Sequence, residues 1–131
     1  MYFIVIGAEK EGQHFVNLTV EGNHEVTLID PSEEKARQIL KENNVRVLVG
    51  NIAEDGILEE AEIERADAVI AATYDDAQNL MAMVLAKEQG VDTLISLVNY
   101  KIHDNIFEKL GVNVVSEPAR VVAHQLYDCL G

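Results

Sequence analysis

The sequence is poor in cysteine and in long apolar runs, and each shortage narrows the class of protein. Its single cysteine, Cys129, cannot form a disulfide within the chain, as is usual in a reducing compartment, and we expect it to pack from a helix. No apolar run reaches membrane-spanning length, and Met1 leads into a strand-like segment, not a basic signal peptide. These features predict a cytoplasmic protein without direct membrane insertion.

Positive charge is also scarce. The chain has 10 Lys and Arg residues against 23 Asp and Glu residues, which gives a formal net charge of −13. A surface this acidic repels the phosphate backbone of nucleic acids. We therefore expect no DNA or RNA partner.

The sequence also lacks the residue patterns of common catalytic and metal sites. It has no G-x-S-x-G motif, no paired His and Cys, and no cluster with metal-ligand spacing. The histidines are expected on the surface or satisfied in the core, and they are His14, His24, His103 and His124. We therefore expect neither an enzyme nor a metal site.

Strand-like apolar runs alternate with helix-like segments along all 131 residues. The expected strands are Tyr2–Ile6, Glu25–Ile29, Arg46–Val49, Ala68–Ala72, Thr93–Val98 and Asn113–Val115. The expected helices are Gly12–Glu21, Ser32–Asn43, Gly56–Ala61, Asp75–Gln89, His103–Leu110 and Pro118–Leu130. Continuous apolar runs are typical of strands that are buried on both faces of a parallel sheet. The pattern predicts a single α/β domain, a Rossmann-type doubly wound parallel sheet of six strands in the order 3-2-1-4-5-6.

Local signals support these boundaries. Gly22, Gly90 and Gly111 each follow a predicted helix, where a left-handed residue commonly ends it. Ser32 suits the cap of the second helix. Met81 and Met83 lie on a predicted core helix, and we expect both to serve packing.

The first strand runs into a turn that nearly matches the dinucleotide-binding motif G-x-G-x-x-G. Gly7 and Gly12 hold the outer positions, but Glu9 stands at the middle one. At an effective dielectric near 20, two charges about 4–5 Å apart repel by roughly 3–4 kcal/mol. Motion of Glu9 into solvent and compensation by Lys10 would leave about 1–3 kcal/mol, or one to two orders of magnitude in affinity. The turn predicts a phosphate site that is weakened, not abolished.

The other strands end in polar residues that a parallel sheet brings to the same edge. Asp30 ends the second strand near the spacing of about 20 residues at which an acid binds ribose, although before Pro31 it also suits a turn. Asn51 follows the third strand and by itself is a common loop residue. Asp75 and Asp76 follow the fourth strand, where they suit helix caps.

Four ordered segments together resemble a known family. They read EGNHEVTLID, VLVGNIAEDGILEEAEIERADAVIAAT, DDAQNLMAMVLAKEQGV and FEKLGVNVVSEPARVVAHQL. The chain resembles, over nearly its whole length, the TrkA-type N-terminal domain (KTN, or RCK N-lobe) of potassium transporter and channel regulators. The resemblance implies a cytoplasmic regulatory domain that binds NAD(H) or an adenine nucleotide (AMP, ADP or ATP). It also implies a homodimer or higher homo-oligomer, peripheral to the inner membrane through a potassium transporter or channel partner.

The resemblance also assigns residues to the nucleotide site. The expected binding residues are Gly7, Ala8, Glu9, Lys10, Glu11, Gly12, Asp30, Asn51, Ile52, Thr73 and Tyr74. Asn51 stands where the family usually has aspartate, and Asn79 matches a family asparagine. Leu97 lies where the family commonly has an arginine that can neutralise phosphate. Glu9 and Leu97 together predict that AMP-like ligands bind better than NAD(H).

Three functions stay open on the sequence. The first is a regulatory nucleotide-binding domain, the second an assembly module with a vestigial site. The third is a small NAD-dependent oxidoreductase, which normally needs a further substrate-binding region. The last helix, Pro118–Leu130, carries the apolar stripe Val121, Val122, Leu126 and Leu130. This stripe either packs on the chain's own sheet or, as the resemblance implies for a crossover helix, on a partner subunit.

Overall fold

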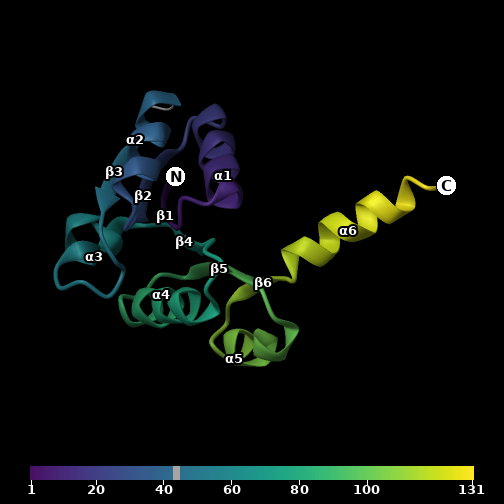
Figure 1. Ribbon diagram of the computed structural model, residues 1–131. Helices are drawn as coiled ribbons and strands as arrows, with labels where there is room; N and C mark the ends of the chain where they lie inside the picture. Colours follow the sequence, from purple (N-terminus) through teal and green to yellow (C-terminus); the bar gives the residue numbers. More distant parts are fainter. Residues whose placement is uncertain (43–44) are drawn as a thin grey trace.

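The computed structural model describes residues 1–42 and 45–131, and a six-stranded sheet forms its centre (Figure 1). The strands are β1 (Tyr2–Ile6), β2 (Glu25–Asp30), β3 (Arg46–Val49), β4 (Ala68–Ala71), β5 (Thr93–Val98) and β6 (Asn113–Ser116). Their order is β3-β2-β1-β4-β5-β6, and every neighbouring pair is parallel. The predicted doubly wound sheet and its strand order are confirmed.

Helices cover both faces of the sheet. They are α1 (Lys10–Glu21), α2 (Glu33–Glu42), α3 (Ile57–Glu60), α4 (Asp76–Glu88), α5 (Asp104–Lys109) and α6 (Pro118–Asp128). The short 3₁₀ helices η1 (Ile63–Arg65) and η2 (Lys101–His103) complete the chain. The predicted end of the second helix at Asn43 lies outside the described residues. No helix within the described ranges is long and apolar enough to cross a membrane.

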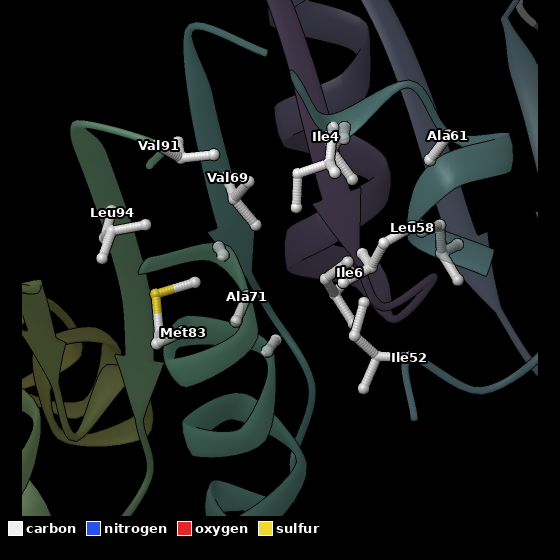
Figure 2. Close-up of a cluster of buried hydrophobic side chains, with 14 of the residues drawn as sticks. Ile4, Ile6, Ile52, Leu58, Ala61, Val69, Ala71, Met83, Val91 and Leu94 are labelled. Atoms are coloured by element: carbon white, nitrogen blue, oxygen red, sulfur yellow. The ribbon is translucent and has the colours of Figure 1, made fainter. Parts of the chain in front are cut away.

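Two buried clusters join these helices to the sheet. One contains Val5 and Leu28 of the sheet with Val16 of α1 and Ile39 of α2. The larger one, on the other face, includes residues of α3, α4 and α5. Figure 2 shows Met83 of α4 there, among side chains from β4 and β5. Met83 is fully buried, but Met81 is 46% exposed, so the prediction that both methionines pack is wrong for Met81.

Helix α1 begins at Lys10, two residues earlier than predicted, and Gly12 therefore lies inside it. A Cβ atom at Gly12 would lie only 2.0 Å from the carbonyl oxygen of Gly7. Gly7 has a φ of +110°, a conformation that residues with a side chain rarely adopt. The two glycines allow α1 to start in contact with the end of β1.

The helix ends follow the glycine signals only in part. Gly90 and Gly111 adopt the left-handed conformation, with φ of +83° and +84°, as predicted. Gly22 does not, because Asn23 takes the left-handed position with a φ of 61°. Asparagine tolerates this conformation better than most residues. The predicted cap of α2 is confirmed, since Lys35 N–H donates to Ser32 Oγ at 3.2 Å.

Asp76 ties the start of α4 to the end of β5, so its role exceeds the predicted cap. Its buried carboxylate accepts N–H bonds from Asn99 at 2.7 Å and Tyr100 at 3.1 Å, and lies 2.7 Å from His103 Nδ1. Burial alone would raise the pKa of Asp76, but these bonds outweigh burial and hold it below its usual value. Asp75 is the helix cap, accepting from the N–H groups of Ala77 and Gln78.

Helix α6 projects away from the sheet and the other helices (Figure 1). All of its residues are described, and none of them is buried. Its exposed apolar side chains, with those of the next residues, are Val121, Val122, Leu126, Tyr127 and Leu130. The alternative that this stripe packs on the chain's own sheet is therefore wrong. Cys129 is also exposed, so it does not pack within the chain.

We expect Gly12→Ala to lower the free energy of unfolding by roughly 3 kcal/mol, measured by urea unfolding. An alanine inside a helix normally stabilises it, but here the methyl group would overlap the Gly7 carbonyl. Gly90→Ala is the control, because its left-handed backbone has no atom within 4 Å of the added Cβ. That control should cost about 1–2 kcal/mol. A stabilised Gly12→Ala variant would contradict the contact.

We expect Asp76→Asn to lower the free energy of unfolding at pH 7 by about 1.5–3 kcal/mol, as for hydrogen bonds to a charged group. Since the folded-state pKa is lowered, the carboxylate stabilises the fold above the ordinary pKa of about 4. This contribution is lost as the pH falls through the folded-state pKa. Urea unfolding at several pH values should therefore show a difference that shrinks below about pH 4. Asp92→Asn, at an exposed carboxylate, is the control, and a pH-independent difference would refute the assignment.

Candidate functional site

A cavity of about 340 Å³ opens at the carboxyl ends of the central strands. Its lining residues are Ile6, Gly7, Glu9, Ile29, Asp30, Pro31, Ser32, Lys35, Gly50, Asn51, Ile52, Thr73, Tyr74, Asp75 and Gln78. They lie at or after the ends of β1, β2, β3 and β4, and the order of the sheet reverses between β1 and β4. Ligands of open α/β sheets bind at this edge, and the volume lies near the lower end of small-molecule sites, about 300–1000 Å³.

The cavity brings together seven of the residues predicted for the nucleotide site. They are Gly7, Glu9, Asp30, Asn51, Ile52, Thr73 and Tyr74. The other four, Ala8, Lys10, Glu11 and Gly12, do not line it. Ala8 and Gly12 are buried, whereas Lys10 and Glu11 are exposed on α1.

Asp30 connects the turns that follow β1 and β2. It is only 6% exposed, and its carboxylate oxygens accept N–H bonds from Ala8 at 2.7 Å and Ser32 at 2.8 Å. The bond to Ser32 confirms that Asp30 opens a turn. An ionised carboxylate has about four acceptor positions, so two bonds leave room for hydroxyl donors in the cavity. The two interpretations of Asp30 are therefore compatible.

Glu9 forms an ion pair with Lys35 of α2. Its carboxylate makes no hydrogen bond that caps its own helix α1. The hydrogen bond with Glu9, together with the charge of Asp30, raises the pKa of Lys35 despite some desolvation. The cation that offsets Glu9 is therefore Lys35, and the prediction that Lys10 does so is wrong. Lys35 lies in the first turn of α2, directly after the end of β2, and this position in the sequence is a signal that its side chain can reach the same edge of the sheet.

A buried asparagine holds the loop after β4, which carries Thr73 into the lining of the cavity. Asn79 is fully buried, and its Oδ1 lies 3.1 Å from Thr73 N and 2.6 Å from Thr73 Oγ1. Its Nδ2 donates to the carbonyls of Thr73 at 3.1 Å and Leu97 at 3.0 Å. Asn79 therefore positions the loop that carries Thr73 and does not itself line the cavity.

Two further residues singled out in the sequence are Asn51 and Leu97. Asn51 Oδ1 accepts from Ala53 N–H at 2.9 Å, and Asn51 N–H donates to Glu54 at 3.0 Å, which closes a tight turn. Leu97 is half-buried on β5 and does not line the cavity. That an arginine at position 97 would neutralise phosphate stays a prediction.

The cavity is acidic overall. Among the described residues that line it, Glu9, Asp30 and Asp75 carry negative charge and Lys35 carries the only positive charge, a formal sum of −2. Burial and, next, a hydrogen bond with Glu11 raise the pKa of the Tyr74 phenol, so Tyr74 adds no charge to the lining. No group of three or more His, Cys, Asp and Glu side chains in the described part could hold a metal ion.

Comparison with known proteins gives the same picture of the fold. A Trk system potassium uptake protein TrkA homolog from Methanothermobacter thermautotrophicus is 33% identical over 126 residues, which cover 96% of this chain and 58% of that protein. The structure of the Shewanella denitrificans Kef CTD in AMP-bound form is similar, with a TM-score of 0.83 and 18% identity over 100% of this chain and 82% of that one. The GsuK channel bound to NAD has a TM-score of 0.77 and 16% identity over 87% of this chain and 21% of that one.

At these identities, the two solved structures show the shared fold alone. The family is shown by the sequence: the pattern of the TrkA-N domain matches residues 3–118, from β1 to the first residue of α6. This chain therefore belongs to the TrkA-N domain family.

Proposed function

We propose that this chain is a regulatory nucleotide-binding domain of a potassium uptake or channel system and has no chemistry of its own. The observation that carries the proposal is the cavity at the edge where the strand order reverses, with the buried Asp30 at its side. The similar TrkA homolog is named as a potassium uptake protein, and the chain spans 58% of its length. The partner is accordingly a membrane potassium transporter or channel subunit, which the domain meets at the cytoplasmic face.

The ligand is an adenine nucleotide, with AMP preferred over NAD(H). Asp30 retains acceptor capacity for ribose hydroxyls, as dinucleotide-binding folds require. The acidic lining opposes additional phosphate charge, and a cavity of about 340 Å³ suits a mononucleotide better than a dinucleotide. The AMP of the Kef structure and the NAD of the GsuK structure support the ligand class.

The lining argues against an oxidoreductase or a hydrolase. Its described residues include no His or Cys, and its two aliphatic hydroxyl groups, those of Ser32 and Thr73, already make local hydrogen bonds. Ser32 Oγ accepts from Lys35 N–H, and Thr73 Oγ1 bonds Asn79. Neither hydroxyl has an adjacent base that could activate it. The alternative that remains distinct is an assembly module whose cavity binds no nucleotide.

Helix α6 serves as the crossover helix and packs against a second copy of the chain. Its apolar side chains are exposed along one helix, and Pro118 begins it directly after the turn at Glu117. Monomeric proteins rarely leave a contiguous apolar surface exposed. A two-fold arrangement would bury the same stripe on both copies.

We expect AMP to bind the wild-type chain more tightly than NADH in calorimetry at low salt. Asp30→Asn should weaken AMP about tenfold, because one acceptor of the ribose hydroxyls is lost. Asp55→Asn, at an exposed carboxylate outside the cavity, should leave AMP binding unchanged. Thermal unfolding of each variant checks that the fold is retained. Submicromolar NADH affinity would contradict the ligand preference, and no binding of either ligand would favour the assembly module.

We expect a dimer or larger assembly in light scattering at tens of micromolar chain. Leu126→Glu should convert it to monomers, because the substitution places a charge in the apolar stripe of α6. Leu40→Glu on α2 introduces the same charge at another exposed leucine and should leave the assembly intact. A wild-type monomer under these conditions would overturn the dimer.

A further inference from the structure

The described lining of the cavity contains one positively charged side chain, Lys35, and it forms an ion pair with Glu9, an acidic residue of the same cavity. Neither residue is needed for ribose binding, the role proposed above for Asp30. The pair is therefore available to another group of the ligand.

The starts of two helices, α1 and α2, place Glu9 and Lys35 next to each other. Lys35 N–H bonds to Ser32 Oγ at 3.2 Å, which holds Lys35 in the first turn of α2. Its side chain extends to Glu9, the residue directly before α1. A phosphate held at the start of α1, where helices of this fold bind phosphates, would thus lie within the reach of Lys35.

The pair can open at little cost. The side chain of Lys35 is 40% exposed and that of Glu9 is 28% exposed, and ion pairs with such access to solvent are weak. A phosphate monoester carries close to two negative charges and three acceptor oxygens, against one charge for Glu9. It is therefore the stronger partner for the ammonium group.

We propose that Lys35 binds the 5′-phosphate of the nucleotide after leaving Glu9, and that Glu9 restricts the site to ligands with one phosphate. This inference rests on the proposed function, since it requires a nucleotide in the cavity. Lys35 can pair with one phosphate group, and the described lining offers no second cation for another. Glu9, once released, repels any further phosphate, so affinity falls from AMP to ADP to ATP.

Calorimetry with adenosine, AMP and ADP separates the two roles. Lys35→Met should weaken AMP about tenfold to a hundredfold, the usual range for a charge-assisted hydrogen bond, while adenosine binds within about twofold of the wild type. Glu9→Gln should strengthen ADP more than AMP, because it removes repulsion from the second phosphate. Both effects should shrink as salt rises. Arg37→Met removes a cation of α2 that pairs with Glu33 outside the cavity, and should change none of the affinities.

The outcomes also separate this inference from the proposed function. If AMP binds but Lys35→Met leaves the ratio of AMP to adenosine affinity unchanged, Lys35 does not hold the phosphate and the inference is wrong. If Glu9→Gln strengthens AMP and ADP equally, Glu9 does not select the number of phosphates. If the wild-type chain binds neither adenosine, AMP nor ADP, the proposed function fails and the inference fails with it.

Discussion

The arrangement of the cavity depends on one buried carboxylate. Asp30 accepts a backbone N–H from the turn after β1 and another from the turn after β2. These bonds direct the start of α1 and the start of α2 toward the same space, because each turn leads directly into its helix. The positions of Glu9 and Lys35 follow from this geometry. A buried charge is costly unless it is hydrogen-bonded, and here its two bonds also order the site.

Buried polar side chains perform the corresponding task on the other side of the cavity. Asn79 holds the loop after β4, which lines the cavity, and Asp76 holds the loop after β5, which does not. Both residues lie near the start of α4, so one helix positions two loops. Two of the loops that line the cavity, those after β2 and β4, are therefore held by the short buried side chains of Asp30 and Asn79, which satisfy backbone groups.

The sequence predicts what depends on periodicity and spacing. Buried runs such as that of β4 indicate the parallel sheet, and two residues of the predicted nucleotide site, Gly7 and Asp30, lie at the edge of the sheet where the cavity opens. The sequence does not reveal that Lys35 is the partner of Glu9. The two residues are distant in sequence, and their pairing depends on how α2 packs on the sheet. The sequence also does not show that Leu97 is absent from the lining, since a strand position alone does not show which cavity a side chain reaches. Met81 illustrates the same limit for a helix whose apolar residues extend beyond its buried face.

The detachment of α6 has a consequence for how this segment acquires its structure. An isolated helix of 11 residues is marginal in water, because helix nucleation is costly and few backbone bonds follow it. Packing on the rest of the chain does not supply the missing stability, since none of the described residues of α6 is buried. Helix formation and burial of its apolar stripe are then linked equilibria: whatever covers the stripe also increases the helical population of the segment.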